Sequence, residues 1–196
     1  MDGFELTNDE KALLLKHARQ ALECGVRGEP LEPLDLSKLP TVFKTHAATF
    51  VTLTKDGMLR GCIGALEATI SLVEDARQHA VAAALQDYRF PPVQPSELGD
   101  IRLELSILTP LERLDYTEPG DLPKLIQPGV DGVVLRQDWQ RATFLPQVWE
   151  KIPSPEDFLS RLCEKMGAQP DLWRRKTLSV FTYRVIKIHE EENTDT

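Results

Sequence analysis

Apolar residues recur along the chain at two spacings, and each spacing predicts a different kind of element. Between positions 12 and 22 they recur every three or four residues, which is typical of an amphipathic helix. Thr7 and Glu10 precede this stretch with the spacing of a capping box. Gly25 is the expected stop, because glycine readily takes the left-handed conformation that ends helices.

Two further segments carry the helical period. The second helix is expected to begin at Ser71, with Glu74 again at capping-box spacing, and its apolar positions are mostly alanine. Such small side chains would let that helix lie close to a sheet. The third helix is expected to begin at Ser154 and Pro155 and to end at Gly167.

Strand segments alternate between apolar and polar residues, or are rich in β-branched residues, and they come mostly as hairpins. The expected strands are residues 49–54, 58–66, 101–108, 130–136, 141–145 and 177–188. Asp56-Gly57 supplies the turn of the first hairpin, because Asp-Gly tolerates positive φ. Hairpins with helices inserted between them predict an α+β fold with antiparallel or mixed sheets and packed helices.

Length and charge limit the classes of protein to which the chain can belong. Its 196 residues fit a single domain, with a core at about residues 13–188 and a solvated acidic tail at 189–196. The net charge of −8 argues against nucleic-acid binding, which needs a basic face to neutralise phosphates. No apolar run approaches the roughly 20 residues that a membrane span needs.

Three cysteines, Cys24, Cys62 and Cys163, are an odd number and form no C-x-x-C pair, so a disulfide framework is not expected. A reducing compartment is the simpler interpretation. The N-terminus also lacks the basic and apolar regions of a signal peptide. We therefore expect a cytoplasmic protein.

The most informative segment is Leu59-Arg60-Gly61-Cys62-Ile63-Gly64. Glycines weaken a strand, so Gly61 and Gly64 suggest a bulge or the close approach of another group. Bare backbone amides there can hold a carboxylate or phosphate, and Arg60 adds a planar cation for the same anion. Cys62 is a candidate nucleophile if a neighbouring arginine stabilises its thiolate. The alternative is a bulged strand with a buried structural cysteine.

Charged residues elsewhere could orient these groups. Glu104 lies mid-strand on a polar face and would pair with Arg60 or Arg89 if that face lines a cleft. Asp87 and Arg89 are one residue apart at the end of the second helix and could serve similarly. The alternatives are a solvent-facing strand for Glu104 and an exposed ion pair of little energetic weight for Asp87 and Arg89.

The sequence offers little for a metal, a base or a cofactor. Four histidines stand far apart and form no metal-binding pair, so we expect no metal site. His46 precedes the strand that pairs with the Cys62 strand and could approach the thiol, but nothing local requires it. No phosphate-binding or dinucleotide-binding glycine loop is present, so we expect no cofactor.

Several strings together resemble the AMMECR domain family, whose bacterial and archaeal members are called AmmeMemoRadiSam system protein A. The resemblance covers about residues 13–188 and departs from the family at Tyr88, where proline is more common. The strings that carry it are Leu59-Arg60-Gly61-Cys62-Ile63-Gly64, Asp87-Tyr88-Arg89-Phe90, Leu105-Ser106-Ile107-Leu108-Thr109-Pro110 and Phe144-Leu145-Pro146-Gln147-Val148.

The resemblance implies a two-lobed α+β fold with the Arg60–Gly64 segment at a central cleft. It adds Gln147 to the candidate ligand-binding residues Arg60, Gly61, Gly64, Asp87, Arg89 and Glu104. It also implies two partners, a Memo-like protein and a radical SAM enzyme, but no particular reaction. Two hypotheses follow: a component that binds a small anionic ligand and acts through Cys62, or a scaffold that binds a peptide or protein without catalysis.

Overall fold

The computed structural model describes residues 4–190. The chain divides into two compact units, which share no sheet. The first unit contains the chain up to Leu108 and the segment that begins at Ile186, and the second unit is Thr109–Val185. Within the described residues, no helix is long and apolar enough to cross a membrane.

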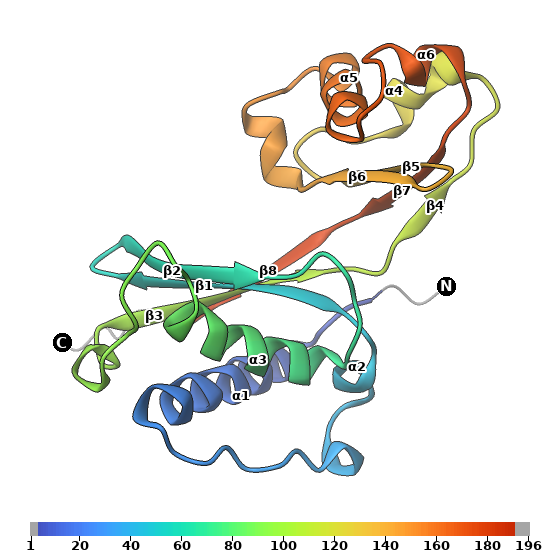
Figure 1. Cartoon of the computed structure of the whole chain (residues 1–196). Helices are drawn as coiled ribbons and strands as arrows, with labels where there is room; N and C mark the ends of the chain where they lie inside the picture. Colours follow the sequence, from blue (N-terminus) through green and yellow to red (C-terminus); the bar gives the residue numbers. More distant parts are fainter. Residues whose placement is uncertain (1–3, 191–196) are drawn as a thin grey trace. The chain divides into compact units, whose positions relative to one another are not determined.

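The first unit is built on a four-stranded sheet with the order β2-β1-β3-β8 (Figure 1). The strands are β1 (Ala48–Lys55), β2 (Met58–Gly64), β3 (Ile101–Leu108) and β8 (Val185–His189). The helices α1 (Asn8–Arg27) and α3 (Leu72–Leu85) cover one face of this sheet (Figure 1). The shorter elements are α2 (Thr41–Lys44), η1 (Leu36–Lys38) and η2 (Pro95–Glu97).

Alternation along the strands decides which face of this sheet is buried. Val51 and Leu53 of β1, with Leu103 and Leu105 of β3, are buried in the same apolar core as the helices. The residues between them therefore point to the opposite face, because successive strand side chains alternate. That second face carries Thr52 of β1 and Glu104 and Ser106 of β3.

Helix α1 begins as predicted and ends later than predicted. The Thr7 amide donates to the Glu10 carboxylate at 2.8 Å and the Glu10 amide donates to Thr7 Oγ1 at 3.3 Å, so the capping box is formed. The helix passes through Gly25 and ends at Arg27, and Gly28 caps it with a φ of 69°. Gly25 has a packing role instead, because an added Cβ would lie 2.9 Å from a methyl of Val81 on α3.

Helix α3 begins after Ser71, as predicted, but without the predicted backbone cap. Ser71 Oγ donates to the Glu74 carboxylate at 2.5 Å and accepts nothing from the first turn. The alanine row is buried, which places the helix backbone close to the sheet. The end of this helix thereby approaches β2, where the candidate site lies.

The second unit has a sheet with the order β4-β7-β5-β6. Its strands are β4 (Glu112–Leu114), β5 (Gly132–Gln137), β6 (Gln140–Phe144) and β7 (Ser179–Tyr183). The helical elements are η3 (Pro119–Asp121), α4 (Leu122–Leu125), η4 (Pro146–Glu150), α5 (Pro155–Lys165) and α6 (Leu172–Arg175). Trp149 stacks on Phe158 in its core, with ring centroids 3.7 Å apart. Two antiparallel sheets with packed helices confirm the predicted α+β class.

The predicted single strand at residues 177–188 is wrong, because the chain leaves one sheet and enters the other within it. Strand β7 ends at Tyr183, and β8 begins at Val185. At the break, Arg184 exchanges hydrogen bonds with Thr109, whose amide donates to the Arg184 carbonyl at 2.9 Å. Apolar and β-branched residues continue on both sides of the break, so composition alone could not reveal it.

The predicted acidic tail at 189–196 is also wrong at its start. His189 belongs to β8, and Glu190 is held by the body of the first unit. The Glu190 carboxylate accepts from the Arg19 guanidinium on α1 and from the Leu103 amide on β3. Residues 191–196 lie outside the described residues.

Candidate functional site

Strand β2 carries a bulge at Arg60, as the glycines around it predict. In the pairing of β2 with β1, Gly61 lies opposite Leu53 and Leu59 lies opposite Thr54. Arg60 is therefore the extra residue, with no partner on β1. A bulge of this kind re-aims a side chain, and here it turns Arg60 out of the strand ladder.

Gly61 and Gly64 are required by packing. A Cβ on Gly61 would lie 2.2 Å from the carbonyl oxygen of Ala83 in α3, and one on Gly64 would lie 2.4 Å from the Phe50 ring. The close approach that the sequence suggests is therefore confirmed. The approaching groups belong to the chain itself: α3 at Gly61 and the Phe50 ring at Gly64.

Cys62 lies on the polar face of the sheet. Its neighbours Gly61 and Ile63 face α3 and the apolar core, so the Cys62 side chain points the other way. It stands opposite Thr52 on β1, whose Oγ1 donates to the Cys62 Sγ at 3.4 Å. The thiol is half-buried and free of any disulfide.

Asp87 and Arg89 cover the outer edge of β2 beside Cys62. The Asp87 side chain is only 3% exposed and accepts from the Cys62 amide at 2.8 Å. It also accepts from Arg89 Nε at 2.9 Å and from Arg89 Nη2 at 2.6 Å. Arg89 Nη2 in turn donates to the Cys62 carbonyl at 3.2 Å. Both outward backbone groups of Cys62 are thus occupied by side chains of the chain itself.

These contacts shift the pKa values of both side chains. Hydrogen bonds from the Arg89 side chain and from the Cys62 amide outweigh burial and hold the pKa of Asp87 well below its ordinary value. Asp87 raises the pKa of Arg89, and the nearby Cys62 thiol acts in the same direction. The pair is therefore charged throughout the neutral pH range, with the cation close to the thiol.

Arg60 is engaged at every nitrogen of its guanidinium. Its Nε and Nη2 donate to the two oxygens of Glu97 at 3.1 and 3.0 Å, and its Nη1 donates to the Pro91 carbonyl at 3.0 Å. The side chain is 13% exposed. The Arg60 hydrogen bonds are the largest cause that lowers the pKa of Glu97 to about 2. Arg60 thus fastens β2 to η2, and its cation is already neutralised.

Glu104 is paired with neither Arg60 nor Arg89. It pairs with Lys187 on β8, with Nζ 4.0 Å from the Glu104 carboxylate. Arg60 forms its salt bridge with Glu97, and Arg89 forms its salt bridge with Asp87. The bulge and the turn after α3 direct both arginines away from β3. Glu104 nevertheless shares the polar sheet face with Cys62, as the strand register shows.

Two residues of this cluster were not assigned a role from the sequence. Glu97 is 37 positions from Arg60 and Thr52 is 10 positions from Cys62. The alternation of β1 could have placed Thr52 on the polar face, because Val51 and Leu53 mark the other one. No local pattern could have paired Glu97 with Arg60, since η2 reaches it only through the fold.

The remaining candidates have other surroundings. Gln147 lies in η4 of the second unit and has an exposed side chain. His46 forms an isolated bridge with Ser71, and no histidine in residues 4–190 is hydrogen-bonded to the Cys62 thiol. Across the same residues, no three His, Cys, Asp or Glu side chains are grouped to hold a metal ion.

Comparison with known proteins identifies the family. A family model described as AMMECR1 matches residues 15–188. The chain belongs to the AMMECR1 family. The segment Arg60–Gly64 and the Asp87–Arg89 pair both lie within the matched region.

Relatives in the AMMECR1 family match over nearly their full lengths. A protein from Methanothermobacter thermautotrophicus is 41% identical over 191 residues, which is 95% of this chain and 97% of the relative. Protein MJ0810 from Methanocaldococcus jannaschii is 33% identical over 193 residues, 95% of this chain and 92% of the relative. The crystal structure of the uncharacterized protein PH0010 from Pyrococcus horikoshii has a TM-score of 0.73 at 30% identity, covering 95% of this chain and 94% of that one. None of these names states an activity, so function must be argued from the site.

Proposed function

We propose that this AMMECR1-family chain binds a small anionic ligand beside the Cys62 thiol, with Arg89 as the principal cation. Arg89 is 45% exposed, and its Nη1 makes no hydrogen bond within the described residues. A guanidinium with an open edge suits a carboxylate or phosphate. The single observation that carries the proposal is this open edge, held next to Cys62 by a buried carboxylate.

The other residues have supporting roles in this proposal. Asp87 orients Arg89, and the two contacts to Cys62 fix the distance between the cation and the thiol. Arg60 is a positioning residue, because its guanidinium is saturated by Glu97 and Pro91. Gly61 lets β2 lie against α3, which brings the whole arrangement together.

Cys62 can contact the ligand directly. The proposal has two forms, a non-covalent contact and a covalent bond to the Cys62 sulfur. The Thr52 hydroxyl donates a hydrogen bond to Sγ and so helps to hold the sulfur in place. A nucleophilic thiol usually has an adjacent base, and no histidine supplies one within residues 4–190. The non-covalent contact is therefore the form that the geometry favours.

The cellular setting is also a proposal. The resemblance to AmmeMemoRadiSam system protein A supports a pathway shared with a Memo-like protein and a radical SAM enzyme. Three free cysteines support a reducing compartment, with the cytoplasm as the simplest case. A small anion passed between such enzymes would fit a component that binds without completing a reaction itself.

Calorimetric titration with inorganic phosphate tests the role of Arg89. We expect Arg89→Gln to weaken phosphate binding at least about tenfold, since a charge-assisted contact contributes roughly 1.5–3 kcal/mol. Arg27→Gln is the matched control, because Arg27 is 44% exposed and also pairs with a carboxylate, that of Glu23. Arg89→Lys keeps the charge beside Asp87 and should recover part of the affinity. Equal affinities for all four proteins would contradict the proposal.

A peptide- or protein-binding role without catalysis is the second candidate, and one observation favours it. Tyr88, between Asp87 and Arg89, is 95% exposed, and Met58 and Leu59 on β2 are exposed as well. Apolar side chains held in solvent beside a charged site are common at interaction surfaces. The phosphate titration separates the candidates. A protein-binding surface would lose its partner on Tyr88→Ser and leave phosphate binding unaltered.

A further inference from the structure

Strand β8 forms the outer edge of the first sheet, on the side opposite β2. Its last contact with β3 is the Glu190 amide, which donates to the Leu103 carbonyl at 3.1 Å. In an antiparallel pair, alternate residues direct their backbone groups to the neighbouring strand. Lys187 and His189 therefore direct their backbone N–H and C=O groups outward, and no strand within the described residues pairs with them.

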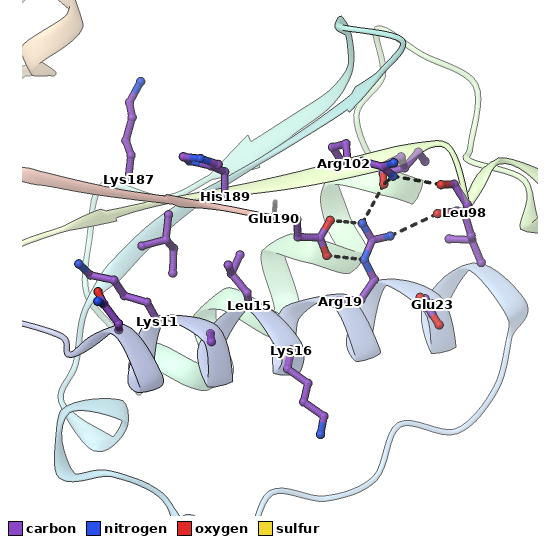
Figure 2. A pocket seen from close by; sticks show the side chains of 15 residues that line it. Lys11, Leu15, Lys16, Arg19, Glu23, Leu98, Arg102, Lys187, His189 and Glu190 are labelled. Atoms are coloured by element: carbon purple, nitrogen blue, oxygen red, sulfur yellow. Dashed lines mark hydrogen bonds and ion pairs between the residues drawn. The ribbon is translucent and has the colours of Figure 1, made fainter. Parts of the chain in front are cut away.

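A groove runs along this free edge, between β8 and α1 (Figure 2). Its volume is about 1030 Å³. Arg19 lies at one end of the groove. Its guanidinium donates to the Glu190 carboxylate and to the carbonyls of Leu98 and Ile101. Leu15 points from α1 toward β8, so the side of the groove next to the helix has apolar surface (Figure 2).

The groove is positively charged on a chain whose net charge is −8. Five cationic side chains line it, Lys11, Lys16, Arg19, Arg102 and Lys187, against two acidic ones, Glu23 and Glu190. Both acidic side chains are paired, Glu23 with Arg27 and Glu190 with Arg19, and among the cations Lys187 also lies 4.0 Å from the Glu104 carboxylate on β3. The surplus of positive charge would attract an acidic partner.

The arrangement of the cations suits an extended segment better than a compact anion. Lys187 and His189 stand on the side of β8 away from α1, whereas Lys11 and Lys16 project from α1 (Figure 2). The charges flank the edge and do not converge on one point. A strand added to β8 would place alternate side chains on these two sides.

We propose that β8 and the groove dock an extended acidic segment of a partner protein, which adds a fifth strand to the sheet. Its acidic residues would lie opposite Lys187 and His189, as cross-strand pairs of opposite charge. The residues between them would be apolar and would point toward Leu15 and Ile188. This interaction is independent of the Cys62 site, because β8 and β2 are the opposite edges of the sheet.

A capped peptide of alternating glutamate and valine probes this surface, with its lysine–valine counterpart as the control. We expect the acidic peptide to bind at low salt and to slow hydrogen exchange at the amides of Lys187 and His189. Lys187→Glu should weaken binding about tenfold, since a cross-strand attraction becomes a repulsion. Lys44→Glu makes the same change of charge at an exposed position outside the groove and should have no effect.

Three results would overturn the proposal. The acidic peptide could fail to protect these amides, or it could bind no better than the lysine–valine peptide. It could also bind only after removal of residues 191–196, which would assign the groove to the chain's own C-terminus. Lys187 is 59% exposed, so Lys187→Glu should remain folded, and its circular dichroism spectrum checks this.

Discussion

Replacement of Gly61 with alanine is expected to destabilise the first unit by about 3 kcal/mol or more. The new Cβ would lie 2.2 Å from the backbone carbonyl oxygen of Ala83. No side-chain rotation can relieve a clash with backbone, so β2 and the end of α3 must separate. Chemical denaturation monitored by circular dichroism measures the change in the free energy of unfolding.

Gly99→Ala is the matched control for this prediction. Nothing lies within 4 Å of a Cβ at Gly99, and its φ is not in the left-handed region. We expect a change within about 0.5 kcal/mol at this position. If the two alanine variants unfold at the same denaturant concentration, β2 and α3 are not packed as described.

Replacement of Asp87 with alanine is expected to lower the free energy of unfolding by about 3 kcal/mol. This is the second large effect. Asp87 is buried and accepts from the Cys62 amide and from the Arg89 side chain, and charge-assisted bonds of this kind contribute most when one partner is buried. Asp100→Ala is the control, because Asp100 is exposed and lies 3.8 Å from Lys55. An exposed pair of that kind contributes about 0–1 kcal/mol.

The same carboxylate predicts a pH dependence. The pKa of Asp87 is lower in the folded chain than its ordinary value of 3.8, chiefly because of Arg89. The stabilisation that the Asp87 carboxylate gives the folded chain is therefore fully present above pH 3.8. It is lost as the pH falls through the lower pKa of the folded state. The stability difference between the wild type and Asp87→Asn should be constant near neutral pH and should shrink below about pH 4. A difference that grows in acid would contradict the assignment.

The sequence predicted those features that depend on neighbours along the chain. The Thr7 capping box, the Asp56-Gly57 turn and the alternation of β3 follow from local spacing, and the structure has them where they were expected. Gly25 shows the limit of this reasoning. Its conformational freedom suggested a helix end, but its packing against Val81 explains why glycine is there.

The sequence predicted only part of the candidate site. Asp87 and Arg89 are adjacent enough to be recognised as a pair, and the bulge at Arg60 follows from the glycines beside it. The partner of Arg60 could not be predicted, because η2 brings Glu97 to it across the fold. Once these pairings are known, Arg89 replaces Arg60 as the cation with an open edge.

Alkylation of the wild-type chain in the presence of inorganic phosphate tests most directly whether an anion binds beside Cys62. Cys24 is also free and half-buried, so it serves as an internal control when labelling is followed at each cysteine by peptide mass. Our account predicts that phosphate slows labelling of Cys62 in a saturable manner and leaves Cys24 unchanged. Labelling of Cys62 at the same rate at every phosphate concentration, or equal slowing at both cysteines, would contradict it.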